Sequence, residues 1–559
     1  MHAHRAVDGL GFAVTNPYRA LAGTFLRSWP GVVHTRRSVM ASKLASQNGA
    51  AALVVVVALL GASLAVACSR SHQTSGEPAP VASSLPAPGA SSAVASASAP
   101  LHLAASSASV DAGPAWGEQR IYALGIETFI RAVPGRGARA IGYLRVGASL
   151  RRSDAPANTE SCKGGWYAVE PEGYVCNSDS ASLDPDAALL AYARPGPLRG
   201  QPLPYQYARV RGKVPHYYAR LPSEAEVRRI EGGEAVGYYK ASFHAPYPNI
   251  ELLGDPIDVP PALLKEQRVP RPPGAAPRLR FKFHTGRAEP NTRLALMTWF
   301  VHEQRRWAIT SQLDLVALDR LRLLEPPKFR GIEIPDSQTL PVAFLRVAAA
   351  QGYVFDEHGK LARTEPLRHR QGFHLTGKDK TQGGKKLLET REGIWVPEGL
   401  LKIIAARDRA PTFVKQDTLR WIDISIEDQT LVAYRGSKPV YATLVSTGGG
   451  GIGDPETTNS TPQGLFAIFS KHVTTKMTGD EIGSEYLIDD VPYVQYFHKG
   501  YALHGAFWHD NFGRVQSHGC VNLAPQDAAW LFEFTAPAVP AGWHGKYVKS
   551  GGTPVLIRR

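Results

Sequence analysis

One uncharged apolar run, Ala50–Ala67, constrains the chain most. Its 18 residues are enough to cross a bilayer as one helix. Because no second run of this length follows, a polytopic membrane protein is excluded. Arg36, Arg37 and Lys43 precede the run and Cys68 follows it, an order typical of a secretory signal. We therefore expect the folded part to lie after the run and outside the cytoplasm.

The end of this run carries a lipidation signal. Ala65-Val66-Ala67-Cys68 resembles a bacterial lipobox, in which the cysteine becomes the lipidated first residue. The resemblance implies a leader over residues 1–68 and a lipid anchor on Cys68, with the protein on the periplasmic side of the membrane. A plain cleaved signal and an uncleaved anchor are the alternatives, and Met40 is an alternative start.

The next segment is too polar and too simple to fold. Of the 45 residues in 69–113, 32 are Ala, Ser, Pro or Gly, and such a composition buries too little apolar surface to offset the entropy of ordering the chain. We predict a flexible tether over residues 69–115. The net charge of +14 indicates anionic partners, and export makes nucleic acid an unexpected one.

The rest of the chain is predicted to be mainly β and multidomain. Its 559 residues favour three to four domains, and residues 141–150 and 165–176 alternate apolar and polar side chains between turns. Cys162 and Cys176 bracket the second pair of strands, which in an exported protein predicts a disulfide. The alternative is two free buried thiols.

The segments RAVPG, IGYLRVG and CKGGWYAVEPEGYVC together resemble a bacterial Src-homology-3-like barrel over residues 116–180. The resemblance implies a wall-binding or positioning module. Residues 181–418 are predicted to be an accessory β-rich region, with a second barrel-like module near 340–402.

The C-terminal residues 419–559 carry the chemistry. They contain His504-Gly505 and Ser517-His518-Gly519-Cys520. A thiol becomes a nucleophile when a neighbouring imidazole takes its proton, and Gly519 lets the backbone approach a substrate closely. Cys520 is also the cysteine left over once the lipid site and the disulfide are assigned. Three alternatives stay open at this point: a zinc site that includes His509, an inert buried thiol, and a decayed binding module.

These residues closely resemble the signature of the YkuD-type L,D-transpeptidases, which cross-link bacterial cell walls. The match consists of His504-Gly505, Gly513, SHGCVNL, and the upstream STPQGLFAI and PYVQYF segments in the same order. The resemblance implies a β-sandwich catalytic domain over 419–559 that follows the small β modules. It implies no metal and no organic cofactor.

The resemblance also implies roles for individual residues. Cys520 would be the nucleophile, His504 its base, and Gly505 the residue whose carbonyl orients the imidazole. His518 and Gly519 would shape the oxyanion hole. The predicted substrate-binding residues are Ser517, Asn522, Tyr496 and Trp508. Asn522 stands where many members carry Arg, and sandwich core is the alternative for Tyr496 and Trp508.

The implied reaction forms an acyl-enzyme on Cys520 from a peptidoglycan stem tetrapeptide and releases the terminal D-amino acid. The acyl group then passes to an amine acceptor. An L,D-carboxypeptidase that uses water and a non-catalytic wall-binding lipoprotein are the alternatives. We expect a monomer held at the membrane by its lipid or signal anchor.

Overall fold

The computed structural model describes residues 116–559 except 194–195, 279–283 and 480–485. The predicted signal, lipidated Cys68 and tether therefore lie outside the described residues. Within the described ranges, no helix is long and apolar enough to cross a membrane. The prediction of a mainly β, multidomain chain is confirmed, since the strands form four sheets of three, sixteen, six and seven strands.

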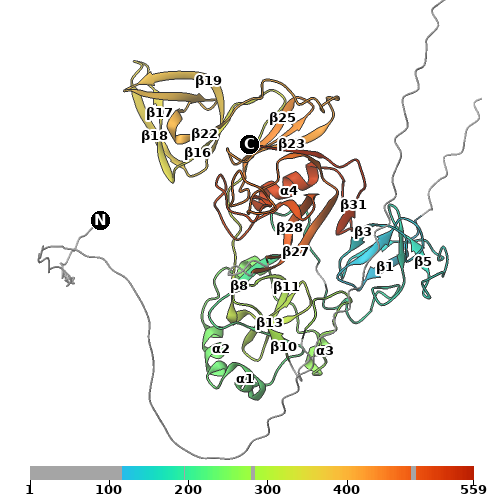
Figure 1. Cartoon of the computed structure of the whole chain (residues 1–559). Coiled ribbons are helices and arrows are strands. Elements are labelled where there is room, and N and C mark those ends of the chain that lie inside the picture. Colours follow the sequence, from blue (N-terminus) through green and yellow to red (C-terminus); the bar gives the residue numbers. More distant parts are fainter. Residues whose placement is uncertain (1–115, 194–195, 279–283, 480–485) are drawn as a thin grey trace, which may run out of the picture. The chain divides into compact units, whose positions relative to one another are not determined.

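The first module contains seven short strands, which Figure 1 draws in blue to cyan. They are β1 (Arg120–Ala123), β2 (Thr128–Arg131), β3 (Ala140–Leu144), β4 (Ser149–Arg151), β5 (Trp166–Ala168), β6 (Tyr174–Cys176) and β7 (Ala181–Ser182). Because apolar and polar residues alternate along these strands, the side chains of Ile121, Ile130 and Val175 all point into one core. The described strands form open sheets and no closed barrel, so the Src-homology-3 resemblance stays a prediction.

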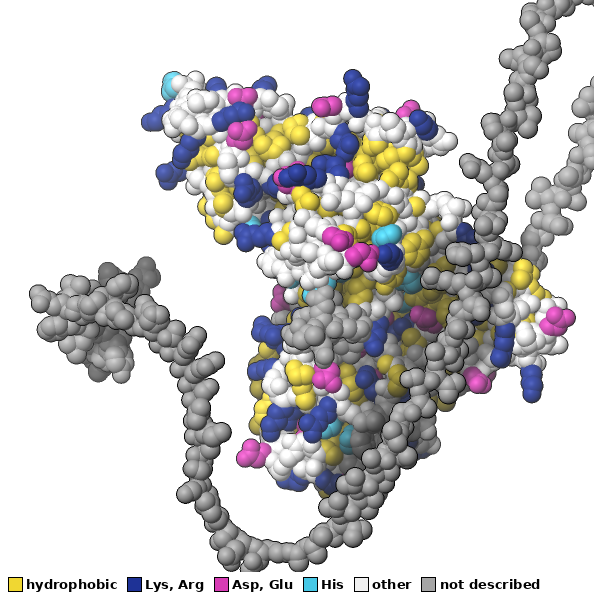
Figure 2. Space-filling model, in the orientation of Figure 1, with side chains coloured by type: hydrophobic (Ala, Val, Ile, Leu, Met, Phe, Trp, Pro, Cys, Tyr) yellow, Lys and Arg dark blue, Asp and Glu magenta, His cyan; other side chains and the backbone are white. Residues whose placement is uncertain are grey.

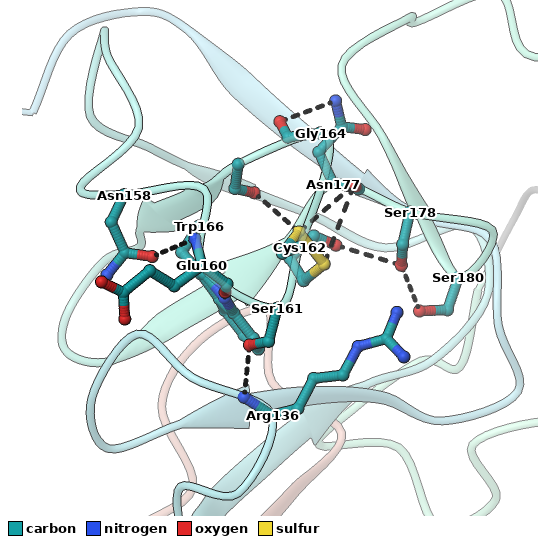
Figure 3. The surroundings of a disulfide bond; sticks show 12 residues. Arg136, Asn158, Glu160, Ser161, Cys162, Gly164, Trp166, Asn177, Ser178 and Ser180 are labelled. Atoms are coloured by element: carbon teal, nitrogen blue, oxygen red, sulfur yellow. Dashed lines mark hydrogen bonds between the residues drawn. A yellow bond between two sulfur atoms is a disulfide. The ribbon is translucent and has the colours of Figure 1, made fainter.

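The predicted disulfide is present in this module (Figure 3) and joins Cys162 to Cys176. Cys162 is 2% exposed, and the neighbouring Trp166 indole donates a hydrogen bond of 2.8 Å to the Glu160 carbonyl. The cross-link therefore fixes the hairpin β5–β6 to the loop that precedes it.

The accessory region holds more helix than the sequence analysis predicted. Its elements as far as residue 333 are β8 (Gln206–Val210), β9 (His216–Tyr218), α1 (Glu224–Glu231), α2 (Ala235–His244), η1 (Ile250–Leu253), α3 (Pro261–Leu264), β10 (His284–Arg287), β11 (Arg293–His302), β12 (Arg305–Thr310), β13 (Leu315–Ala317), η2 (Leu318–Arg320), β14 (Leu321–Leu323) and β15 (Ile332–Glu333). Helix α1 begins with a capping box between Ser223 and Glu226. This helix-start signal is visible in the sequence, but no helix was predicted here.

A second module follows as a separate seven-stranded sheet. Its elements are β16 (Val342–Leu345), β17 (Ala349–Phe355), β18 (Leu361–Arg368), β19 (Gly372–Gln382), β20 (Lys385–Thr390), β21 (Trp395–Pro397), η3 (Glu398–Leu400) and β22 (Leu401–Ile404). Its core holds Leu345, Phe373 and Val396. Figure 2 shows many Lys and Arg side chains on the surface of this module.

The C-terminal domain is a sandwich of two sheets. Its elements are β23 (Arg420–Ser425), β24 (Thr430–Arg435), β25 (Lys438–Leu444), β26 (Gly464–Ala467), β27 (Ser470–Gly479), β28 (Tyr486–His498), β29 (Tyr501–Gly505), β30 (Val521–Leu523), α4 (Pro525–Phe534), β31 (Gly545–Tyr547) and β32 (Pro554–Arg558). Ile422 and Leu431 from one sheet meet Tyr493 and Leu503 from the other, with Phe532 of α4 in the same core.

The large sheet runs across the predicted domain boundaries. Strand β3 of the first module pairs with β31, and β11 of the accessory region pairs with β28 at Arg293 and Ile488. A buried ion pair of 2.9 Å joins Arg145 to Asp490 on β28, and Asp490 also accepts a hydrogen bond of 2.7 Å from the Thr474 hydroxyl. The accessory strands therefore extend and brace the sheet that carries β28 and β29.

Candidate active site

Two neighbouring parallel strands position the proposed nucleophile and base. In the β29–β30 pair, His504 lies opposite Asn522, and Cys520 stands one residue before β30. A strand spacing of about 4.8 Å and a rise of about 3.3 Å per residue place Cys520 about 8 Å from His504 between Cα atoms. Because alternate residues share a face, both side chains point to the same side of the pair. The register thus places thiol and imidazole on one side of the strand pair.

His504 is buried and neutral. It is 3% exposed, and this burial, with a smaller contribution from His509, lowers its pKa to about 4. Its Nδ1 lies 3.3 Å from the Gly505 carbonyl oxygen. A neutral ring that donates Nδ1–H to this carbonyl keeps the lone pair on Nε2 free to accept a proton. The Trp508 ring stacks on the imidazole with 5.7 Å between centroids.

Cys520 is the free cysteine of the described residues and is partly buried. Burial raises the pKa of its thiol, and a backbone hydrogen bond from Ala502 partly opposes that rise. The Sγ atom lies 3.9 Å from the Gly500 carbonyl. The resting site therefore holds a thiol beside a neutral imidazole rather than a thiolate beside an imidazolium.

The turn before Cys520 is fixed by Ser517 and Gly519. The Ser517 hydroxyl accepts a hydrogen bond of 3.1 Å from the Gly519 N–H and donates one to the Cys520 carbonyl. Gly519 has a φ of +116°, and a Cβ there would lie 2.5 Å from the Tyr501 ring. The position therefore requires glycine both for its backbone angle and for space. The exposed His518 side chain stands between these two residues.

Asn522 is held by a histidine that the sequence analysis placed only in the zinc alternative. The Asn522 side-chain amide lies 2.9 Å from His509 Nε2, and the Asn511 N–H donates to His509 Nδ1 at 3.2 Å. The neutral His509 ring must then carry its proton on Nε2 and donate it to the amide oxygen of Asn522. The atom of the Asn522 amide that faces away from His509 is buried and has no hydrogen-bond partner among the described residues, and with the amide turned as this tautomer requires, that atom is the NH2 nitrogen. Asn522 can therefore donate to a ligand.

Tyr496 and Trp508 lie at the same apolar cluster as Cys520. All three pack, partly buried, against a cluster that includes Ala502 and Phe507. The pKa of Tyr496 rises to about 12 because of burial and the nearby Cys520. The structure thus gathers all of the predicted catalytic and substrate-binding residues around β28, β29 and β30, with the disulfide in the first module. The sequence analysis gave no role to two residues with a part in this arrangement, namely Tyr501 beside Gly519 and Thr461 within the STPQGLFAI segment.

Thr461 links the glycine-rich segment before β26 to the turn. Its hydroxyl accepts from the Gly448 N–H at 2.9 Å and donates to the Gly519 carbonyl at 2.8 Å. The Thr461 hydroxyl therefore ties the glycine-rich segment to the turn before Cys520. Across the described ranges, His, Cys, Asp and Glu side chains form no group of three that could hold a metal ion.

Comparison with known proteins identifies the class of this domain. Residues 419–557 match the family model of YkuD, the L,D-transpeptidase catalytic domain. The C-terminal part of the chain is therefore a YkuD catalytic domain. A search of curated proteins finds no match.

Solved structures of L,D-transpeptidases are also similar to parts of this chain. The crystal structure of an Enterococcus faecium enzyme variant is 26% identical over 26% of this chain and 50% of its own, with a TM-score of 0.19. The solution structure of the E. faecium catalytic domain is 27% identical over 25% of this chain and 98% of its own, with a TM-score of 0.19.

An enzyme from Mycobacterium smegmatis is 16% identical over 43% of this chain and 89% of its own, with a TM-score of 0.20. The chain spans only 50% to 65% of the length of the first three similar structures.

Proposed function

We propose that this protein is a peptidoglycan L,D-transpeptidase with Cys520 as its nucleophile and His504 as its base. The observation that carries the proposal is the placement of His504 on β29 and of Cys520 directly before the neighbouring strand β30, inside the YkuD match. The His504 imidazole is neutral, and its Nδ1 faces the Gly505 carbonyl. Its Nε2 is therefore the atom that takes a proton.

In the first step the Cys520 sulfur attacks the carbonyl carbon of the amide between the third and fourth residues of a stem tetrapeptide. A C–S bond forms while His504 Nε2 takes the thiol proton. The C–N bond then breaks, and His504 returns the proton to the departing amine of the terminal D-amino acid. The product of this step is a thioester on Cys520.

In the second step an amine of another stem attacks the thioester carbonyl. His504 takes a proton from this amine, the C–S bond breaks, and the thiol is restored. A new amide joins the two stems. Water in place of the amine would give a carboxypeptidase.

The raised thiol pKa shapes this mechanism. The raised pKa of the thiol and the pKa of about 4 of the imidazole both disfavour a preformed thiolate–imidazolium pair. Proton transfer therefore accompanies C–S bond formation instead of preceding it.

The oxyanion of the tetrahedral intermediate needs backbone donors. We assign this role to the Cys520 N–H, for which no described residue provides an acceptor. The Gly519 N–H is already bonded to the Ser517 hydroxyl, so Ser517 and Gly519 act by holding the turn. The exposed His518 lies on the open side of this turn. The Asn522 amide NH2 and the aromatic faces of Tyr496 and Trp508 place the donor stem.

The protein acts in the cell envelope, anchored by a lipid on Cys68, as a monomer. Residues 116–180 form a Src-homology-3-like wall-binding module, residues 181–418 an accessory region, and residues 419–559 the catalytic domain.

Intact-mass measurement with a carbapenem tests the nucleophile. The full chain should gain one drug molecule, whereas the Cys520→Ala variant should gain none and His504→Ala should react at least 100 times more slowly. Incubation with a stem tetrapeptide then distinguishes the two reactions, because transpeptidation gives a cross-linked peptide dimer and hydrolysis gives a tripeptide. A wild-type chain with reduced Cys520 and no adduct would favour the non-catalytic wall-binding lipoprotein.

A further inference from the structure

A cavity of about 630 Å³ lies between the second module and the loop that follows β29. Its walls come from the end of β16, the β18–β19 turn, the η3–β22 segment and residues 510–514. Its charged lining is mostly cationic: Arg346, Arg370, Lys402 and Arg514 against the single carboxylate of Asp510.

Arg370 and Asp510 form a fixed part of the wall. The buried guanidinium of Arg370 pairs with the Asp510 carboxylate and also donates to the Asp510 carbonyl. It lies over the Phe329 and Phe512 rings at 5.4 and 5.9 Å from their centroids. The charges of this pair largely balance, so Arg370 serves as a rigid support.

Arg346 and Arg514 provide the free positive charge. Both side chains are exposed, and within the described residues no carboxylate forms an ion pair with either of them. Lys402 is paired with Asp428 at 3.0 Å. Besides burial, the charges of Arg370 and Arg514 lower the pKa of His369 in the same wall. The cavity therefore has a positive potential.

The same loop connects this cavity to the reactive residues. Asp510 directly follows His509, which holds Asn522 at 2.9 Å, and Asn522 lies opposite His504. The loop is anchored by the Ser446 hydroxyl on the Asn511 carbonyl at 3.1 Å. A substrate that extends past Asn522 along this loop would therefore meet the cavity.

We propose that this cavity binds a free carboxylate of a stem peptide, so that the second β module supplies a substrate subsite. A guanidinium is suited to this task, because its fork of N–H donors binds a carboxylate with two hydrogen bonds. A stem peptide carries the required carboxylate at its C-terminal residue. The inference rests on the proposed function for the identity of the peptide.

The test is the affinity of a soluble stem tetrapeptide for the full chain, in a Cys520→Ala background that prevents turnover. The double variant Arg346→Glu and Arg514→Glu reverses both charges. It should bind the peptide at least about tenfold more weakly, because charged hydrogen bonds are lost and the new carboxylates repel the peptide carboxylate. Arg363→Glu, an exposed arginine on β18 away from the cavity, is the matched control and should change the affinity less than twofold. Raising the salt concentration should weaken peptide binding by the parent and leave peptide binding by the charge-reversed variant unaffected.

Acylation by a carbapenem, measured with Cys520 intact, separates this inference from the proposed function. An unchanged acylation rate together with weakened peptide binding supports the subsite. If charge reversal weakens peptide binding but the chain forms no carbapenem adduct, the subsite is retained and the proposed enzymatic activity is refuted. Equal peptide affinity in the parent and in the reversed variant, with both folded by circular dichroism, overturns the subsite whatever the acylation result.

Discussion

The strongest quantitative prediction concerns the pH dependence of acylation. If neutral His504 is the base, the acylation rate should follow the fraction of unprotonated imidazole, and it should be lost only as the pH falls through about 4. At pH 5 a group with a pKa of about 4 is about 90% neutral, whereas an imidazole with the ordinary value of 6.5 is about 3% neutral. The enzyme should therefore keep most of its acylation rate at pH 5.

The assay is a time course of the carbapenem adduct by intact mass between pH 3.5 and 8, at one ionic strength. Circular dichroism at each pH shows whether the chain stays folded, and drug incubated without protein corrects for its own decay. The raised thiol pKa predicts no fall in rate on the alkaline side. A midpoint near 6.5 in a folded chain would refute the assignment of a buried neutral imidazole as the base.

Three further predictions concern the supporting structure. Gly519→Ala should lower the free energy of unfolding by about 2–4 kcal/mol and remove most of the acylation rate, because it adds both backbone strain and a clash with the Tyr501 ring. The control is Gly451→Ala, at a position with φ +60° and open space around it. In denaturant unfolding this control should lose only about 1 kcal/mol. Asp490→Asn should cost about 3–5 kcal/mol by leaving its arginine partner buried and uncompensated, which would show as a lower unfolding midpoint. The double change Cys162→Ser and Cys176→Ser should cost about 3 kcal/mol and leave the carbapenem acylation rate unchanged.

Local patterns predicted a large part of the fold. Alternation in residues 141–150 and 165–176 predicted short strands where the structure has β3, β4, β5 and β6, and the bracketed hairpin predicted the cysteine pair. These features depend on neighbours within about 15 residues, so one sequence is enough to read them. Helix α1 was equally local, and its capping box at Ser223 went unread.

The pairing between distant segments could not be predicted in this way. The contact of β3 with β31 joins residues about 400 positions apart, and no periodicity indicates which edge strand meets which. His509 shows the same limit at the site. The position of His509 in the sequence does not indicate that the Asn511 N–H fixes the tautomer of this ring. Nor does it indicate that the His509 ring then orients Asn522.

The continuous sheet connects the first module and the accessory region to the strands of the proposed active site. Strand β28 carries Asp490 at one end and leads directly into β29 and His504 at the other. Asp490 is bound by Arg145 of the first module and by Ser311 of the accessory region. A buried carboxylate with partners on two modules holds them in one arrangement, because loss of any partner leaves a charge or hydroxyl unsatisfied. Strands that lie far outside residues 419–557 therefore brace the sheet that carries His504, the proposed base.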